Sequence, residues 1–170
     1  MANVIKLRKG LDIHLTGKAK NVQVTPLKSK QYAVVPDSFG GVIPKVLVRE
    51  GDRVKAGDAL FVNKKYPEEK FASPVSGEIT AVVRGDRRKV LAITIQADET
   101  QEHVDFGRRD VETLTGDEVK NVLLEAGLFG FIQQLPYAVA TTPDTLPRDI
   151  FVSAFRDMPL AADFEVELQG

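Results

Sequence analysis

The stretch LFVNKKYPEEKFASPVSGEI, residues 60–79, decides the fold of this chain. The segments LFVN and KFAS are short and mostly apolar, as β-strands are, and a lysine-rich tip that contains Pro67 separates them. Because proline fixes φ and is favoured in turns, the stretch predicts two strands joined by a turn. The sequence SPVSG at residues 73–77 closes this hairpin.

Short strands are also predicted on both sides of this hairpin. The segments NVQVTPL, QYAVVP and residues 46–48 have β-type composition, and GEITAVVRGDRRKVLAITIQ predicts two strands around a turn at Gly85 and Asp86. Near the start, apolar residues alternate with polar ones, at Ile5, Leu7, Leu11, Ile13 and Leu15. Closely spaced strands with glycine turns predict a mainly β sandwich or barrel.

The pattern changes after Asp98, where a polar connector begins. TGDEVKNVLLEAG predicts a helix, because Thr115 and Glu118 have the spacing of a capping box and Gly127 favours a stop. One face of this helix is apolar, at Val119, Val122, Leu123 and Ala126. LFGFIQQL predicts a second short helix ended by Pro136, and YAVATTPDTLPRD predicts a loop.

The apolar run IFVSAF, residues 150–155, predicts a strand buried on both faces of a parallel sheet. Such a strand needs neighbours, so we expect an α/β domain that is incomplete in this chain. An added strand or a small helix of a complete protein is the alternative. The predicted organisation is a β domain over 1–100, followed over 101–170 by a connector, helices and the first strand of the α/β domain.

The amino-acid composition excludes several classes of function for this chain. The 170 residues carry a net charge of -1 and no basic stripe, which gives no electrostatic argument for nucleic acid binding. The chain has no cysteine, which excludes thiolate chemistry, zinc–cysteine sites and iron–sulfur ligation by its own residues. No apolar run reaches the roughly 20 residues of a membrane span, and the start lacks a signal peptide. We therefore expect a cytoplasmic chain that reaches a membrane only through partners.

VREGDRVKAGDALF together with FASPVSG resembles the lipoyl and biotinyl carrier domains, which are barrel-sandwich hybrids. In those domains the modified lysine stands eight residues before the proline that corresponds to Pro74, and here that position is Tyr66. Lys64 and Lys65 miss it by two residues and one. The resemblance therefore implies a hybrid scaffold without a cofactor arm, unless a one-residue change in the hairpin brings Lys65 to the tip.

Collinear motifs are similar to a second and closer family, the N-terminal part of the A subunit of the Na+-translocating NADH:quinone reductases. They are KGLD from Lys9, SPVSG from Ser73, RGDRR from Arg84, LLEAGLFGF from Leu123, IFVSA from Ile150 and PLAAD from Pro159. Phe129 stands where this family usually has tryptophan, and IQQLPY replaces a more basic pattern.

This resemblance implies a peripheral subunit on the cytoplasmic side of a bacterial inner membrane, docked to the other subunits of the complex. The wider complex uses NADH, flavins, an iron–sulfur centre and ubiquinone, and it moves sodium ions. The chain shows no nucleotide-binding fingerprint, so we assign it no catalytic residue, metal ligand or bound cofactor. An unmodified carrier-type binding module and an Rnf-type electron-transfer subunit remain as alternatives.

The segment GLFGFIQQLPY is the candidate for quinone binding, because a quinone needs an apolar slot with a few hydrogen-bond donors. The candidate residues are Phe129, Phe131, Gln133, Gln134 and Tyr137. The alternative is that these aromatic residues close the core of the α/β domain. The basic turn at residues 84–89 is either a solvated hairpin or a contact with a partner subunit or anionic lipid. Neither His14 nor His103 is expected to bind metal.

Overall fold

The structure, a computed structural model, describes residues 16–17, 29–145 and 147–152. Its larger compact unit spans Lys28–Pro147, and the packing described below belongs to that unit. The strands predicted within residues 1–15 and 21–27 lie outside the described residues, as do His14 and residues 153–155 of the last predicted strand.

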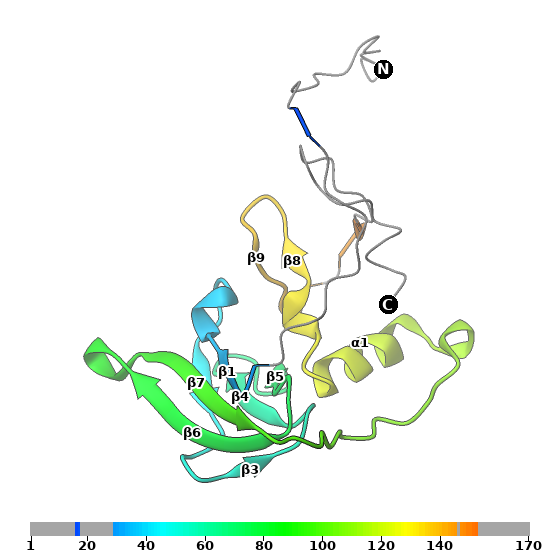
Figure 1. Ribbon diagram of the computed structural model, residues 1–170. Coiled ribbons are helices and arrows are strands. Elements are labelled where there is room, and N and C mark those ends of the chain that lie inside the picture. Colours follow the sequence, from blue (N-terminus) through cyan, green and yellow to red (C-terminus); the bar gives the residue numbers. More distant parts are fainter. Residues whose placement is uncertain (1–15, 18–28, 146, 153–170) are drawn as a thin grey trace, which may run out of the picture. The chain divides into compact units, whose positions relative to one another are not determined.

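Two antiparallel sheets form the body of this unit (Figure 1). The first has the order β1-β7-β6-β3, from Gln31–Val34, Val90–Ala97, Gly77–Arg84 and Arg53–Val54. The second has the order β2-β4-β5, from Pro44–Val46, Ala59–Asn63 and Lys70–Ala72. The mainly β prediction is confirmed. The strand expected at residues 46–48 is wrong by two residues, because β2 ends at Val46.

The core lies between the two sheets; its residues alternate along β7, whereas four consecutive residues of β4 are buried. Its most deeply buried side chains are Leu60, Phe61, Phe71, Ile79, Ile93 and Ile95. The rings of Phe61 and Phe71 stack with their centroids 4.5 Å apart, and Phe39 packs against both. A Cβ atom at Gly77 would lie only 2.0 Å from the carbonyl oxygen of Gln96, so β6 begins where only glycine fits.

A short 3-10 helix, η3, covers Val111–Thr113, and the helix α1 follows at Gly116–Glu125. The predicted capping box is confirmed, with Thr115 and Glu118 bonded to each other's backbone N–H groups. Gly127 follows with φ +72, as predicted for the stop. The four residues of the predicted apolar face are all half-buried, and Leu124 beside them is the buried residue of α1.

The second predicted helix is wrong beyond its first turn. Phe129–Phe131 form a 3-10 helix, η4, but Gln133–Gln134 form the strand β8, which pairs with β9 at Val139–Ala140. The predicted loop therefore contains a strand. Ala140 N–H donates to the carbonyl of Gly40, which lies far away in the sequence. This hydrogen bond satisfies a backbone donor of β9.

The predicted buried strand is not formed at residues 150–152. Ile150, Phe151 and Val152 are exposed and belong to no strand of the described residues. A strand covered on both faces requires flanking strands, and within the described residues none pairs with these three.

Candidate functional site

The tip of the β4–β5 hairpin, residues 64–68, is closed by its own backbone. Asn63 N–H donates to the carbonyl of Glu69 at 3.0 Å, and Glu69 N–H donates to the carbonyl of Tyr66 at 2.9 Å. The side-chain oxygen of Asn63 accepts from Lys65 N–H at 3.1 Å. These bonds fix the turn, while the side chains of Lys64 and Lys65 are exposed.

Tyr66, at the position of the carrier lysine, is tied to a loop 78 residues further along the chain. Its hydroxyl donates to Asp144 Oδ2 at 2.8 Å, and Asp144 Oδ1 accepts from the Thr142 hydroxyl. The bonds from Thr142 and Tyr66 lower the pKa of Asp144, and the bond to Asp144 raises the pKa of Tyr66. The tip is therefore held down at this residue.

Glu69 is a fully buried carboxyl group beneath the same tip. Its Oε2 accepts from Asn63 Nδ2 at 2.8 Å, while Oε1 has no hydrogen-bond partner among the described residues. Burial raises the pKa of Glu69, and the bond from Asn63 offsets part of that shift. A charged carboxylate at this position is disfavoured by burial, because Oε1 has no hydrogen-bond donor among the described residues.

The η4 turn lies directly on this hairpin. A Cβ atom at Gly130 would lie 2.5 Å from Phe71 Cε1 and 3.3 Å from Glu69 Oε1. One turn earlier, a Cβ atom at Gly127 would lie 2.7 Å from the backbone nitrogen of Ala72. Because neither Gly127 nor Gly130 has a side chain, the backbone of the segment after α1 can pack directly against β5.

The five quinone candidates are placed in three different environments. Phe129 is buried, with 6% of its surface exposed, and Gln134 donates to Thr145 Oγ1 at 3.2 Å. Phe131 is 66% exposed and meets Phe39 edge-on, with their centroids 5.1 Å apart. Gln133 is exposed, and Tyr137 is 80% exposed at the turn between β8 and β9.

Three of these candidates are exposed, one is half-buried and one is buried. One shallow pocket in the described part of the chain is lined by Arg108, Arg109, Asp110 and Val111. None of the five candidates lines it. Phe131 and Tyr137 instead join Leu128 and Leu135 as exposed apolar residues of η4 and the β8–β9 hairpin. The segment thus offers an open apolar surface rather than a slot.

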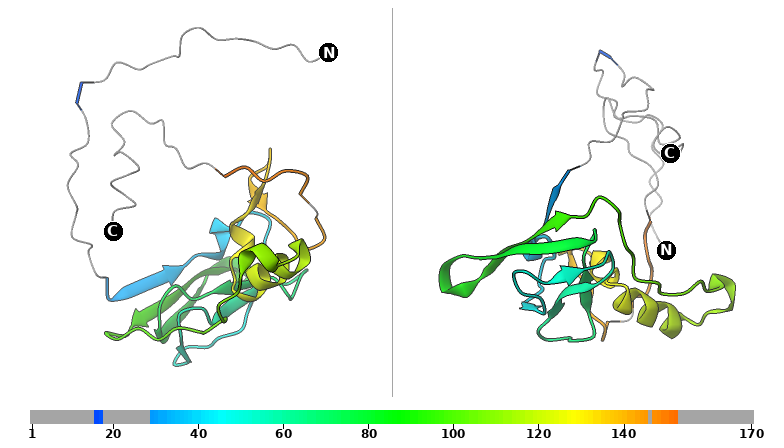
Figure 2. Two further views of the ribbon diagram at one scale, coloured as in Figure 1. Left: turned by 90° about the vertical axis from the view of Figure 1, so that its right-hand side faces the viewer. Right: turned by 60° about the horizontal axis from the view of Figure 1, so that its bottom comes forward.

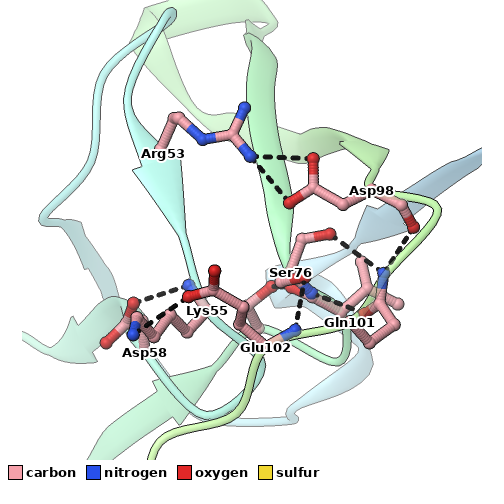
Figure 3. Close-up of polar contacts among 9 residues, drawn as sticks. Arg53, Lys55, Asp58, Ser76, Asp98, Gln101 and Glu102 are labelled. Atoms are coloured by element: carbon pink, nitrogen blue, oxygen red, sulfur yellow. Dashed lines mark hydrogen bonds and ion pairs between the residues drawn. The ribbon is translucent and has the colours of Figure 1, made fainter.

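Sequence reasoning missed a polar clasp between SPVSG and the connector, which Figure 3 shows. Ser76 is buried; its N–H donates to Gln101 Oε1 at 2.7 Å, and its Oγ accepts from Glu102 N–H at 2.9 Å. Arg53 binds both oxygens of Asp98 at 2.8 Å. No local signal could have found these bonds, because the partners of Ser76 lie 25 and 26 positions away.

The connector continues along the barrel beyond this clasp. Ala56 N–H donates to the carbonyl of Glu102, Val104 N–H donates to that of Ala56, and Ala56 forms a parallel bridge with His103. His103 itself is exposed. Among the described residues, no three His, Cys, Asp or Glu side chains gather in a metal-binding arrangement. No helix in that part of the chain has the length and apolar character to cross a membrane.

Comparison with known proteins gives two successive family matches. Residues 5–98 match the family described as the NqrA N-terminal barrel-sandwich hybrid domain, and residues 114–170 match the NqrA second alpha/beta domain. The hybrid scaffold expected from SPVSG is therefore confirmed. The contacts of Tyr66 with Asp144 and of Phe71 with Gly130 join residues that fall in different matched regions.

Curated relatives are named as the A subunit of Na(+)-translocating NADH-quinone reductase. The chain is 36% identical to that of Yersinia pseudotuberculosis over 166 residues, which are 96% of the chain and 37% of the relative. It is 34% identical to that of Haemophilus influenzae over 98% of the chain and 38% of the relative. The chain thus spans little more than a third of these relatives, and it belongs to their family, NqrA of the Na+-translocating NADH-quinone reductases.

Proposed function

We propose that this chain forms part of the peripheral A subunit of a sodium-pumping NADH:quinone oxidoreductase and serves there in docking rather than in redox chemistry. The observation that carries the proposal is the similarity over 96% of the chain to proteins of that name. The anchored Tyr66 also supports it, because a tip held by Asp144 is unsuited to the swinging motion of a carrier arm.

In this role the chain meets the other subunits of the complex at the cytoplasmic side of the bacterial inner membrane. NADH and ubiquinone are the substrates of the whole complex, and flavins and an iron–sulfur centre are held by other subunits. The chain's own contribution is its scaffold. The clasped connector and the glycine contacts of η4 support a preformed surface that a partner subunit could recognise.

Affinity purification of the full-length product from detergent-solubilised membranes tests this role. We expect a flavin-containing complex to copurify with it and to show NADH:quinone activity that rises with sodium. Recovery of the tagged protein without membrane partners would contradict the proposal. The intact mass should match the unmodified sequence, whereas a lipoyl or biotinyl adduct at Lys65 would favour the carrier alternative.

We also propose that a quinone contacts the open apolar surface formed by Phe131, Gln133 and Tyr137, with Phe129 beneath it and Gln134 at its edge. The exposed rings offer stacking area, and Gln133 and the Tyr137 hydroxyl offer donors. A partner subunit would have to supply the opposite wall, because Phe131, Gln133 and Tyr137 are exposed.

Photo-crosslinking of the assembled complex with a quinone analogue tests this contact. We expect label within residues 128–137, and we expect Tyr137→Phe to weaken labelling through loss of the hydroxyl donor. Tyr32→Phe, on β1, removes the same group elsewhere and serves as the control. Labelling confined to other regions would rule out this surface while leaving the docking role standing.

A further inference from the structure

The β6–β7 hairpin ends in a concentrated patch of positive charge. Residues 84–89 contain Arg84, Arg87, Arg88 and Lys89 but only one carboxylate, Asp86. The chain as a whole has a net charge of -1, so this patch is a local feature and not a consequence of overall composition. Arg87 and Arg88 are both exposed.

The backbone of this turn is strained at the two central arginines. Arg87 has φ 53 and Arg88 has φ 61, a left-handed conformation that asparagine and glycine adopt more easily. Lys89 N–H donates to the carbonyl of Asp86 across the turn at 3.1 Å. The turn was expected at Gly85 and Asp86, yet Gly85 has an ordinary φ of -100. Arginines thus occupy the positions where glycine would fold more easily, and strain of this kind points to a role for the side chains.

The side chains of the other two basic residues, Arg84 and Lys89, bind to groups of the protein itself. Arg84 Nη1 donates to the carbonyl of Arg88 at 3.2 Å, and Lys89 pairs with Asp37 on η1, Pro36–Ser38. Neither the Arg87 nor the Arg88 guanidinium makes a hydrogen bond or ion pair within the described residues. The strained turn therefore directs two guanidinium groups to solvent.

Apolar side chains stand immediately behind the cations. Val83 on β6 is 40% exposed, and Leu91 on β7 is 41% exposed. The hairpin reaches out on the side of the compact unit opposite to α1, as Figures 1 and 2 show. Exposed cations next to exposed apolar groups suit a hairpin that lies along a bilayer surface, where the cations meet phosphates and the apolar groups reach toward the acyl chains.

We propose that the tip of the β6–β7 hairpin, residues 83–91, binds the anionic lipid headgroups of a membrane surface. Arginine favours this target because its planar fork pairs with phosphate oxygens through two hydrogen bonds. An acidic protein would recognise the charge, but it would not require the exposed Val83 and Leu91 behind it. The inference extends the docking role, which by itself reaches the membrane only through partner subunits.

Vesicle binding by the 170-residue chain tests the proposal. Vesicles of phosphatidylcholine with roughly a third of phosphatidylglycerol are compared by sedimentation with vesicles of phosphatidylcholine alone, at low and high salt. We expect binding to the anionic vesicles only, weakened by salt because exposed charges are screened. Each cation near an anionic surface contributes about fivefold to the affinity. The double variant Arg87→Asn with Arg88→Gly should therefore bind anionic vesicles on the order of twentyfold more weakly.

The other hairpin tip provides a control matched in charge. Lys64→Asn with Lys65→Gly removes two exposed cations from the β4–β5 tip and should leave vesicle binding close to that of the unaltered chain. Because the Arg87 and Arg88 replacements suit the left-handed turn, we expect both variants to stay folded, so that a loss of binding reports the missing cations. Urea unfolding of each variant verifies this.

A tryptophan reporter locates the contact, since the chain has no tryptophan of its own. We expect the emission of Leu91→Trp to shift to the blue on anionic vesicles and that of Leu135→Trp, on the β8–β9 hairpin, to stay unchanged. Equal vesicle binding by the arginine variant, or no binding by the unaltered chain, would overturn the proposal. Capture by polyglutamate without vesicle binding would overturn it too and assign the tip to an acidic protein instead.

Discussion

The β4–β5 and β6–β7 hairpins both have basic tips, but the first tip is packed against the protein and the second is exposed. At the β4–β5 tip, Tyr66 is bonded to Asp144 and Glu69 is buried beneath Gly130. At the β6–β7 tip, Arg87 and Arg88 are exposed on a left-handed turn. The first tip lies against residues that match the second domain of the family, and the second projects from the compact unit.

The difference shows how one scaffold serves two purposes. A hairpin that would carry a mobile lysine in a lipoyl or biotinyl domain serves here as a seat for the next segment of the chain. That contact is lined by apolar rings and by the buried carboxyl group of Glu69, whose pKa is raised by burial. The projecting hairpin instead combines backbone strain and positive charge at Arg87 and Arg88, on which the proposed membrane contact rests.

The largest expected effect tests how tightly the first tip is covered. Gly130→Ala should destabilise the chain by about 1–3 kcal/mol, because the new methyl group must displace the buried Phe71 ring. Gly116→Ala is the control, since nothing lies within 4 Å of its Cβ position. Urea unfolding compares the two, and an equal loss in both variants would show that the η4 contact is loose.

The second prediction concerns Glu69 and pH. Its pKa is raised in the fold above the unfolded value near 4.5, so its stabilising contribution is complete below that value and is lost as pH rises through the folded pKa. The free energy of unfolding of the unaltered chain should therefore fall with rising pH in this window. Glu69→Gln should flatten the slope. The exposed neighbour Glu68→Gln should nearly preserve it, and identical slopes in all three proteins would contradict the assignment.

The third prediction tests strain at the projecting tip. Arg87→Asn with Arg88→Gly should stabilise the chain by roughly 1 kcal/mol, because those residues suit the left-handed turn. Lys64→Asn with Lys65→Gly should give no such gain, since neither lysine has a positive φ. Thermal or urea unfolding measures both, and a gain at both tips would remove the contrast between the hairpins.

The smallest effect is expected from Tyr66→Phe, which removes the bond to Asp144 at the surface. Global stability should change little, but the β4–β5 tip should open more often. Limited trypsin digestion reports this as faster cleavage after Lys65, with cleavage after Arg87 and Arg88 in the same chain as the internal standard. An unchanged ratio would mean that the backbone bonds of the turn hold the tip without the hydroxyl.

Local signals made much of the fold predictable. The strands on either side of Pro67 and the capping box of Thr115 and Glu118 depend on residues close in sequence, and both were confirmed. The β8 and β9 strands were missed because each is very short and is supported by Gly40, which lies far away in the sequence. Burial of Glu69 contradicts the usual exposure of glutamate, so no rule of composition could find it.

The candidate site was predicted less well than the fold. Counting back from Pro74 identified Tyr66, but its partner Asp144 lies 78 residues away and follows only from the folded chain. The five quinone candidates are close in sequence, yet Phe129 is buried in the core while Tyr137 stands in solvent. Sequence proximity therefore does not determine the burial of each side chain.

The hydrogen bonds of Ser76 to the connector shorten the free part of the chain between the β-sheets and α1. With Asp98, Gln101 and Glu102 fastened to the barrel and Val104 bonded to Ala56, only the residues from Gly107 to the start of α1 remain to span the distance. A shorter free loop costs less closure entropy and raises the effective concentration of η4, which follows α1, at its contact with β5. Ser76 thereby favours the two parts folding as one cooperative body.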